Sequence, residues 1–317
     1  MPLAKIIKVL KENNNFVITT HRHPDGDALG AELAVYFLLK RLKKNVVIFN
    51  EDKVSGNYSF LPYSAKILNK RPVSSKFSVG ISVDCASFDR IGKVKELFDD
   101  IGFIVNIDHH FSNENFGDLN WINSRASSTS EMIYALYKEI FDDLDKKTAL
   151  CIYTGIVTDT GFFSYSSTSA HTHKIASELV KVGVSAPYVY TKVYSAFISK
   201  DISYLGGILS NLKSYFKDKL IIVTSDKWRE SKTGDLTDLL FSVLRNIFTA
   251  EIFVFIKRLD KENIKINFRS KHNFDVNKLA RVFDGGGHKK SAGAVTKGTV
   301  KSINDRIVKL VKTYFDL

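Results

Sequence analysis

The feature that most constrains the fold is an alternation, in the first half of the chain, between short β-branched or aromatic runs and longer stretches with helical periodicity. Helices are expected at residues 28–43 and 130–141, where apolar residues recur three and four positions apart. Strands are expected at residues 16–20, 46–49, 77–83 and 103–107. This repetition is typical of an α/β fold with a mainly parallel sheet and helices on both faces. In such sheets ligands bind at the carboxyl ends of the strands, so functional residues are expected there.

The second half has its own pattern, and 317 residues with 44% hydrophobic content are enough for two domains. The expected elements are a helix at 171–185, a mostly helical stretch to about 216, a strand at 219–225, a helix at 236–246, a hairpin of 250–257 and 264–270, and helices at 276–283 and 300–315. We predict a first domain at 1–186, a helical linker at 187–216 and a smaller α/β domain at 217–317.

Nothing in the sequence predicts export or membrane insertion. Residues 2–14 form a short lysine-bearing amphipathic pattern without the features of a signal peptide. No apolar run approaches the ~20 residues that span a bilayer. The only two cysteines, Cys85 and Cys151, lie in apolar runs and do not suggest a disulfide framework. A cytoplasmic protein without a membrane partner is therefore predicted.

The formal net charge of +12 is distributed unevenly. Residues 1–185 contain 22 Lys and Arg against 21 Asp and Glu, whereas residues 186–317 contain 24 against 13. A polyanionic substrate that is held by the basic part and cut by the acidic part would suit this asymmetry. A lysine-rich surface that is simply solvated explains the counts equally well.

The first polar cluster is HRHPDGDALG at residues 21–30, directly after an expected strand. His21, Asp25 and Asp27 offer one imidazole and two carboxylates that could reach two different cations. The alternative is an ordinary polar turn before a helix, with Asp27 as its N-cap.

Two further clusters also follow apolar strand runs. Asp84 ends the run ISVD, where a carboxylate is costly to bury without a partner. Asp108, His109 and His110 end the run NIDHH, and adjacent histidines diverge, so that one can bind a metal while the other faces a substrate. A turn-forming aspartate or a structural histidine explains each residue taken alone.

The fourth cluster places Asp159 in a Thr/Gly-rich turn after the apolar run 150–157. Taken alone, a turn or helix-cap aspartate is the simpler explanation. Together, however, four clusters that each follow a strand would bring many carboxylates to one sheet edge, where cations must neutralise their repulsion. Oxygen and imidazole ligands without thiolate favour Mn²⁺, and a pair of ions ~3.5–4 Å apart is the usual arrangement for phosphoester hydrolysis.

The order and spacing of HRHPDGDALG, VDCASFD, DHH and TDTGFF resemble the four motifs of the DHH phosphoesterase superfamily. The segment NFRSKHNFDVNKLARVFDGGGHKKSAGA is similar to the DHH-associated C-terminal domain of its nanoRNase and pAp-phosphatase branch. Together these motifs cover nearly the whole chain. Two departures from the usual pattern, Ala31 in place of Ser and Ser291 in place of Ala, affect the expected substrate preference rather than the reaction class.

The resemblance implies two metal sites that share one carboxylate. The first would consist of His21, Asp25 and Asp84. The second would consist of Asp27, Asp84, His109 and Asp159. Asp108 would orient a histidine and His110 would contact the scissile phosphate, so that Asp84, Asp108 and His110 are the expected catalytic residues.

The resemblance also implies a substrate-binding segment in the second domain. Gly285, Gly286 and Gly287 would offer backbone N–H groups to phosphate, as a nest does. Arg269, Ser270 and His288 would hold the far end of the substrate. A plain glycine turn between a helix and a strand is the alternative. Phe274 or Phe283 could stack a base, although both fit a helix core face equally well.

The implied activity is hydrolysis of short linear oligonucleotides, nanoRNA of two to five nucleotides or pApA, to 5′-mononucleotides, with pAp as a further substrate. Two Mn²⁺ per chain are expected, with Mg²⁺ or Co²⁺ as substitutes. Cyclic di-AMP hydrolysis, a pyrophosphatase-like activity, and a catalytically silent nucleic-acid-binding protein remain the alternatives. No stable protein partner is evident, and a homodimer is only a family-level expectation.

Overall fold

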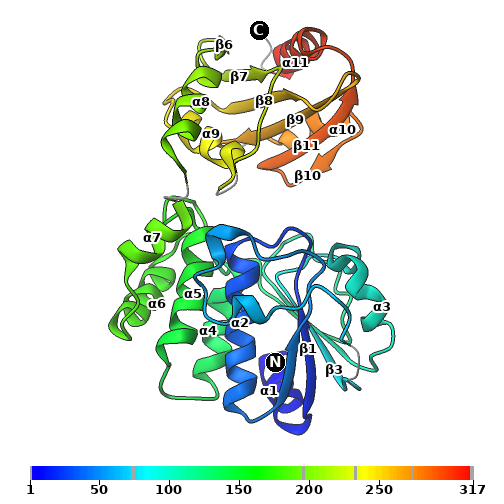
Figure 1. Cartoon of the computed structure of the whole chain (residues 1–317), viewed down its shortest axis with the longest axis vertical. Coiled ribbons are helices and arrows are strands. Elements are labelled where there is room, and N and C mark those ends of the chain that lie inside the picture. Colours follow the sequence, from blue (N-terminus) through cyan, green and yellow to red (C-terminus); the bar gives the residue numbers. More distant parts are fainter. Residues whose placement is uncertain (1, 73–75, 195–196, 232–233, 273, 315–317) are drawn as a thin grey trace. The chain divides into compact units, whose positions relative to one another are not determined.

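The computed structural model describes residues 2–72, 76–194, 197–231, 234–272 and 274–314. The chain divides into two compact units, residues 1–195 and residues 196–317, and each has its own sheet (Figure 1). The predicted domain and linker boundaries stay predictions. The stretch from 187 to 216 contains the end of one unit and the start of the other, with two helices and one short strand.

The first unit is built on a five-stranded sheet in the order β2-β1-β3-β4-β5, in which every pair of neighbours is parallel. Its strands are β1 (Asn15–Thr19), β2 (Asn45–Ile48), β3 (Val79–Val83), β4 (Ile104–Asp108) and β5 (Leu119–Ile122). All five residues of the central β3 are buried, as expected of a strand that is covered on both faces. The expected parallel sheet is confirmed, and β5 is a strand that the sequence pattern did not reveal.

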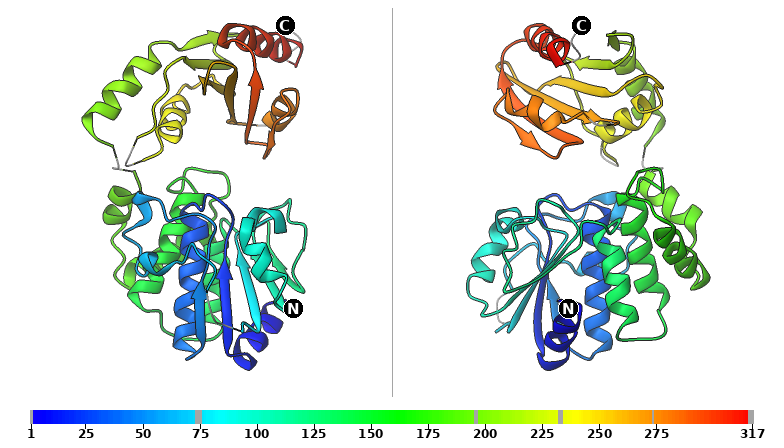
Figure 2. Two further views of the ribbon diagram at one scale, coloured as in Figure 1. Left: turned by 45° about the vertical axis from the view of Figure 1, so that its right-hand side comes forward. Right: turned by 180° about the vertical axis from the view of Figure 1, so that it is seen from behind.

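Helices cover both faces of this sheet, as predicted. The α-helices are α1 (Pro2–Glu12), α2 (Gly26–Arg41), α3 (Lys95–Phe98), α4 (Thr129–Lys138), α5 (Lys146–Asp159), α6 (Ala170–Lys181) and α7 (Ala186–Tyr194). Short 3₁₀ helices lie at Gly56–Tyr58, Ser64–Lys66 and Phe88–Val94. Figure 2 shows α2, α4 and α5 grouped on one side of the sheet and α3 on the other. Ile18 accordingly belongs to the core under α2, and its neighbour Val17 to the core under α3.

The helix pair α2 and α5 positions two of the metal-site segments. A Cβ on Gly30 would lie only 2.5 Å from the Cys151 carbonyl oxygen, so a glycine is needed for this close approach. The run 150–157 lies inside α5, which ends at Asp159. The expectation that Asp159 follows a strand is therefore wrong. The cause is that a short apolar run cannot be assigned to a strand or a buried helix by periodicity alone.

The second unit contains a mixed six-stranded sheet in the order β10-β11-β9-β8-β7-β6. Its strands are β6 (Lys213–Tyr215), β7 (Leu220–Ser225), β8 (Ile252–Arg258), β9 (Asn263–Ser270), β10 (Gly286–Gly287) and β11 (Ser291–Lys297). Its helices are α8 (Ser199–Leu209), α9 (Leu236–Leu244), α10 (Val276–Arg281) and α11 (Val300–Tyr314). The predicted hairpin is confirmed as the antiparallel pair β8–β9, while β6, β10 and β11 were not anticipated.

Each face of the second sheet has its own apolar core. Ile266 and Phe268 of β9 lie in the core that includes residues of α10 and α11. Phe253 and Phe255 of β8 lie in the core on the opposite face with residues of α8 and α9. Among the described residues, no helix combines the length and the apolar character needed to cross a bilayer.

Candidate metal centre

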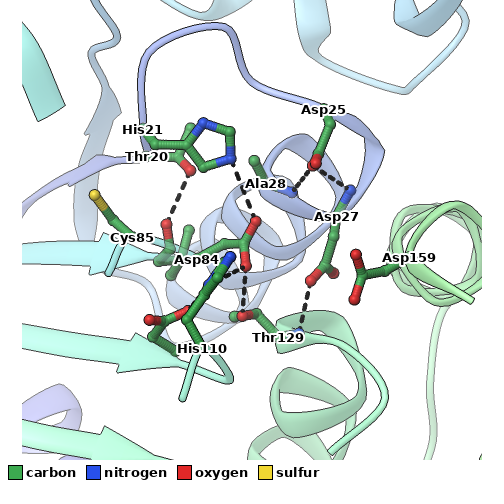
Figure 3. Close-up of polar contacts among 12 residues, drawn as sticks. Thr20, His21, Asp25, Asp27, Ala28, Asp84, Cys85, His110, Thr129 and Asp159 are labelled. Carbon is green, nitrogen blue, oxygen red and sulfur yellow. Dashed lines mark hydrogen bonds and ion pairs between the residues drawn. The ribbon is translucent and has the colours of Figure 1, made fainter. Parts of the chain in front are cut away.

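The acidic and imidazole side chains of all four motifs meet at one edge of the first sheet (Figure 3). Their segments begin or end there: β1 ends two residues before His21, α2 starts at Gly26, β3 ends just before Asp84, and β4 ends at Asp108. Asp159 is the last residue of α5. The convergence that the sequence predicted is therefore present, with a helix end in place of one strand end.

Three overlapping groups of side chains have ligand atoms that all lie within 4.8 Å of one another. The groups are His21–Asp25–Asp84, Asp27–His109–Asp159 and Asp84–His109–His110. Asp84 belongs to two of these groups and links them to one another. Its Oδ2 is 3.5 Å from His21 Nε2, and its Oδ1 is 3.7 Å from His109 Nε2. His109 Nε2 is in turn 3.4 Å from Asp159 Oδ2. This mixed oxygen and nitrogen donor set suits divalent cations such as Mn²⁺.

Local hydrogen bonds fix which nitrogen of each histidine faces the cluster. His21 Nδ1 lies 2.8 Å from the Arg22 carbonyl oxygen, and His109 Nδ1 lies 3.4 Å from the Ala126 carbonyl oxygen. A carbonyl accepts a hydrogen bond from the Nδ1–H that it faces, so in the neutral ring the lone pair lies on Nε2, the nitrogen that faces the cluster. Both rings are thus prepared to bind a cation through Nε2.

Asp27 belongs to the first turn of α2, and its buried carboxylate, 1% exposed, lies at the N-terminus of the neighbouring helix α4. Its two carboxylate oxygens accept the backbone N–H groups of Thr129, at 2.7 Å, and Ser130, at 2.9 Å, in the first turn of α4. Unpaired amides and the positive end of the helix dipole favour a carboxylate there. A Cβ on Gly155 would lie 2.7 Å from Asp27 Oδ1, so this glycine leaves room for the carboxylate.

Asp25 takes the helix-capping position that the alternative explanation of this motif gives to Asp27. Its Oδ1 accepts the N–H groups of Asp27, at 3.0 Å, and Ala28, at 3.1 Å, and it is the N-cap of α2. The alternative in which Asp27 caps this helix is wrong, because α2 begins at Gly26 rather than Ala28. Because Asp25 makes the cap, the Asp27 side chain is not needed there and points into the cluster instead.

The cluster is electrostatically demanding without cations. Burial and the nearby Asp84 raise the pKa of Asp27 to about 7. Burial also works to raise the pKa of Asp84, but contacts with His21, His110 and His109 outweigh it and hold that pKa below its ordinary value. Burial lowers the pKa of His21, yet Asp84 and Asp25 raise it to about 9 overall. Protons therefore stand in for positive charge that divalent ions would supply.

The backbone at Asp84 adopts a left-handed conformation, with φ of +53°. Such a conformation is unusual outside glycine, although aspartate tolerates it better than most residues. It turns the chain sharply after β3, where Thr129 Oγ1 donates a 2.9 Å hydrogen bond to Asp84 Oδ1. The strained turn and this hydrogen bond together fix the shared carboxylate.

Asp108 is fully buried and lies outside the three groups of ligand atoms. Its Oδ1 is 2.6 Å from His110 Nδ1 and accepts the His109 N–H at 2.8 Å. Its Oδ2 accepts a 2.6 Å hydrogen bond from Asn113 Nδ2, which also donates to the Cys85 carbonyl at 3.1 Å. These contacts are those expected of a carboxylate that orients His110.

Sequence reasoning missed several residues that support the cluster. Thr129, Ser130 and Asn113 are polar residues near motifs, with no signal that distinguished them from ordinary cap or loop residues. Glu32 did carry a signal, because it is the one carboxylate in the otherwise apolar centre of α2. Asn50 Nδ2 donates to both Glu32 oxygens at 2.9 and 3.0 Å, and Asn50 Oδ1 accepts the Thr20 N–H at 3.3 Å. This chain of hydrogen bonds holds the segment just before His21.

Two of the predicted substrate-binding residues of the second unit, Arg269 and Ser270, lie on opposite faces of the sheet. Arg269 and Ser270 are consecutive in β9, so their side chains point to opposite faces. Arg269 Nη2 is 3.6 Å from Asp238 Oδ1, and its guanidinium lies over the Phe241 ring at 5.0 Å. Ser270 is buried, and its hydroxyl donates to the Phe274 carbonyl at 2.8 Å.

The glycine run forms β10 and its flanks rather than a free loop. Gly286 pairs with Gly293 and Gly287 with Ala292, so the run is the edge strand of the sheet. A side chain at Gly286 would meet almost nothing, whereas one at Gly285 would lie 2.2 Å from the Gly293 carbonyl oxygen. His288 follows and is exposed. The roles of these residues stay predictions.

The suggestion that Phe274 or Phe283 stacks a base is not supported. Phe274 and Phe283 are only 2% and 1% exposed and belong to the core under α10 and α11. Both are core residues that flank α10, so the alternative of a core position is confirmed, although neither ring belongs to the helix itself.

Comparisons with known proteins agree with this geometry. A protein-family model for the DHH family, N-terminal domain, matches residues 15–156, and a model for the DHHA1 domain matches residues 217–316. The chain is 30% identical over 297 residues, 92% of each chain, to the bifunctional oligoribonuclease and PAP phosphatase NrnA of Bacillus subtilis. It is 26% identical over 310 residues, 93% of this chain and 88% of the relative, to the protein of that name from Thermus thermophilus.

Among solved structures, an exopolyphosphatase-related protein from Bacteroides fragilis superposes on 99% of this chain and 96% of its own. Its TM-score is 0.91 and its sequence identity is 27%. Together with the relatives above and the two family models, this similarity covers both units of the fold. The chain therefore belongs to the DHH family and carries a DHHA1 domain after the DHH domain.

Proposed function

We propose that the protein is a metal-dependent phosphodiesterase that hydrolyses short linear oligonucleotides, such as nanoRNA and pApA, to 5′-mononucleotides. Removal of the 3′-phosphate of pAp is proposed as a second activity of the same site. One observation carries the proposal: four motifs bring carboxylates and imidazoles together, with ligand atoms within 4.8 Å of one another in each group. The names of the Bacillus and Thermus relatives support both activities.

Two Mn²⁺ are proposed as the cofactors, with Mg²⁺ or Co²⁺ as substitutes. The ligands of one would be His21, Asp25 and Asp84. The ligands of the other would be Asp27, Asp84, His109 and Asp159. When bound, such ions lower the pKa of water to ~7 and neutralise negative charge on phosphoryl oxygens.

The chain's own residues complete the proposed site. Asp108 holds the His110 ring through Nδ1, which presents the remaining nitrogen for contact with the scissile phosphate. Burial lowers the pKa of His110, but Asp108 and Asp84 raise it overall, which favours the imidazolium that an anionic substrate would prefer. Arg269 and the N–H groups near Gly286 are proposed to bind the far end of the substrate and to favour lengths of two to five nucleotides.

The test is a panel of substrates with added Mn²⁺. The purified protein should cleave 5′-labelled RNA of two to five nucleotides and pApA faster than longer RNA, and it should release phosphate from pAp. EDTA and the Asp84→Ala substitution should each abolish turnover. Faster turnover of cyclic di-AMP or pyrophosphate would reassign the substrate. No turnover of any phosphate ester, together with RNA binding, would leave the non-catalytic alternative.

A further inference from the structure

Directly after the DHH motif the chain makes a tight turn that exposes an aromatic ring. The Asn113 N–H donates to the His110 carbonyl at 3.2 Å, so that Phe111 and Ser112 occupy the tip of the turn. Phe111 is 93% exposed. Across the described part of the chain, its ring makes no aromatic or cation–π contact. The core therefore gives no reason for a phenylalanine at this position.

The turn is nonetheless held firmly, because both of its ends are attached to one buried carboxylate. Asp108 Oδ1 lies 2.6 Å from His110 Nδ1, and Asp108 Oδ2 accepts a 2.6 Å hydrogen bond from Asn113 Nδ2. Beyond the turn, the Glu114 N–H donates to the Ala86 carbonyl at 2.8 Å. Phe111 thus projects into solvent from a fixed backbone, which keeps the entropy cost of a contact with its ring low.

The position of this ring beside the metal centre indicates what it contacts. His110 Nδ1 is 3.7 Å from Asp84 Oδ1, and Phe111 is the next residue along the chain. A phosphate at His110 would therefore place its attached nucleosides near Phe111. Every nucleobase has a flat apolar face, and stacking of a base on an aromatic ring contributes ~1–3 kcal/mol with little sequence preference.

We propose that Phe111 is a stacking platform for the base of one nucleoside next to the scissile phosphate. The inference rests on the proposed function and adds a specificity element to it. The ring would favour substrates that carry a base, whatever its identity, over base-free phosphate esters. Its binding energy would add to the affinity that the metal ligands supply to all phosphates.

The chain offers a matched control for this proposal. Phe248 is 90% exposed and lies between α9 and β8 of the second unit, away from every proposed metal ligand in the sequence. Phe111→Ala should reduce kcat/KM for pApA by about 5- to 150-fold, the equivalent of the stacking energy. Phe111→Leu should show a similar loss, Phe111→Trp should retain activity, and Phe248→Ala should not change it. Mn²⁺ affinity should be the same in all of these variants.

Two abasic analogues of pApA, each lacking one base, locate the stacked base. For one of them the wild-type protein should lose activity to the level of Phe111→Ala, and the two proteins should then be equal. Equal losses for Phe111→Ala and Phe248→Ala, or a Phe111→Ala defect that persists on both analogues, would overturn the stacking role while hydrolysis by the wild type still supported the proposed function. A wild-type protein that cleaves neither pApA nor short RNA would overturn both.

Discussion

The two units use their polar residues in opposite ways. In the first, candidate ligands from residues 21 to 159 converge within a few ångströms, and His21, Asp27 and Asp84 among them are buried and hydrogen-bonded or ion-paired. In the second, the candidate substrate residues lie between 269 and 288, yet neighbouring side chains point to different faces of a sheet. Residues far apart in the sequence thus meet in one cluster, whereas the adjacent residues Arg269 and Ser270 are separated by the sheet.

The difference teaches how each site tolerates change. A buried cluster of charges is costly to assemble, so each member depends on its partners and on the cations. An exposed strand edge relies on backbone N–H groups and long side chains, which can adjust to a missing neighbour. We therefore expect substitutions in the first unit to affect turnover and those in the second to affect binding.

The largest expected effect belongs to the carboxylate shared between ligand groups. Asp84→Asn should reduce kcat more than about 10³-fold, equivalent to ~4 kcal/mol, because it weakens both proposed ions. Asp159→Asn, which touches a single group, should retain measurable turnover. Steady-state kinetics on pApA at saturating Mn²⁺ compare the two. Equal losses would argue against a shared ligand.

A second test concerns the buried Glu32 beneath the metal centre. Burial raises the pKa of Glu32 from 4.5 to about 8, against the opposing effects of Asn50 and His21. The folded state therefore holds this proton more tightly than the unfolded state does. The contribution of protonated Glu32 to the free energy of unfolding is fully present below pH 4.5 and is lost as the pH rises toward 8. Between pH 5 and pH 8 the loss is on the order of 3 kcal/mol.

Glu32→Gln removes this titration, so the metal-free variant should lose less stability than the wild type between pH 5 and pH 8. Urea unfolding of both proteins in EDTA at several pH values measures the difference. Asp27, with its pKa raised to about 7, contributes a loss of the same sign to both proteins and cancels in the comparison. Parallel pH dependences would show that the pKa of Glu32 is not raised in the folded protein, because the folded and unfolded chains would then release this proton over the same pH range.

The contrast between the two units also explains which features of the fold and of the candidate sites could be predicted from the sequence. The parallel-sheet topology and the convergence of the proposed metal ligands were accessible, because β-branched runs mark strands and the carboxyl ends of parallel strands meet. Asp25 and Asp27 could not be assigned separate tasks, since that depends on whether α2 starts at residue 26 or 28. The hydrogen bonds from the Thr129 and Ser130 N–H groups to Asp27 could not be predicted either. They join residues about a hundred positions apart in the sequence and form only because α4 packs beside Asp27.

In the second unit, the sequence pattern left parts of the structure unpredicted for a different physical reason. Arg269 and Ser270 look equivalent in a motif, but strand alternation separates them, and the strand β11 that pairs with them was not expected. Short glycine-containing strands such as β10 leave almost no periodic signal, so the run was interpreted as a nest-like segment or a glycine turn and not as a strand at the sheet edge.

A smaller loss of turnover is expected when the orientation of His110 is disturbed. Asn113→Ala removes the donor to Asp108 Oδ2 and should lower kcat/KM about 10- to 100-fold, as is typical of residues that orient a site from behind. Asn123→Ala is a suitable control, because within the described residues the exposed Asn123 side chain accepts a local bond from the Arg125 N–H, at 3.2 Å, and its other hydrogen bonds, to Asp108 and Ala126, are made by the backbone and persist in the variant. The pH profile of kcat should shift in the first variant alone. An unchanged profile with normal kcat/KM would mean that Asp108 holds His110 unaided.

The smallest effect is expected in the second unit, and it decides whether the contrast between the units holds. Arg269→Ala should raise KM for pApA about tenfold, near the lower limit for a charged hydrogen bond, and leave kcat nearly unchanged. Arg258→Ala is the matched control, since Arg258 lies on the neighbouring strand β8 and pairs with Asp226 at 3.0 Å. Arg269→Lys should recover only part of the affinity, because a lysine lacks the planar fork that binds phosphate through two parallel bonds. A fall in kcat comparable to that of Asn113→Ala would place Arg269 in the chemical step and end the division of labour proposed between the two units.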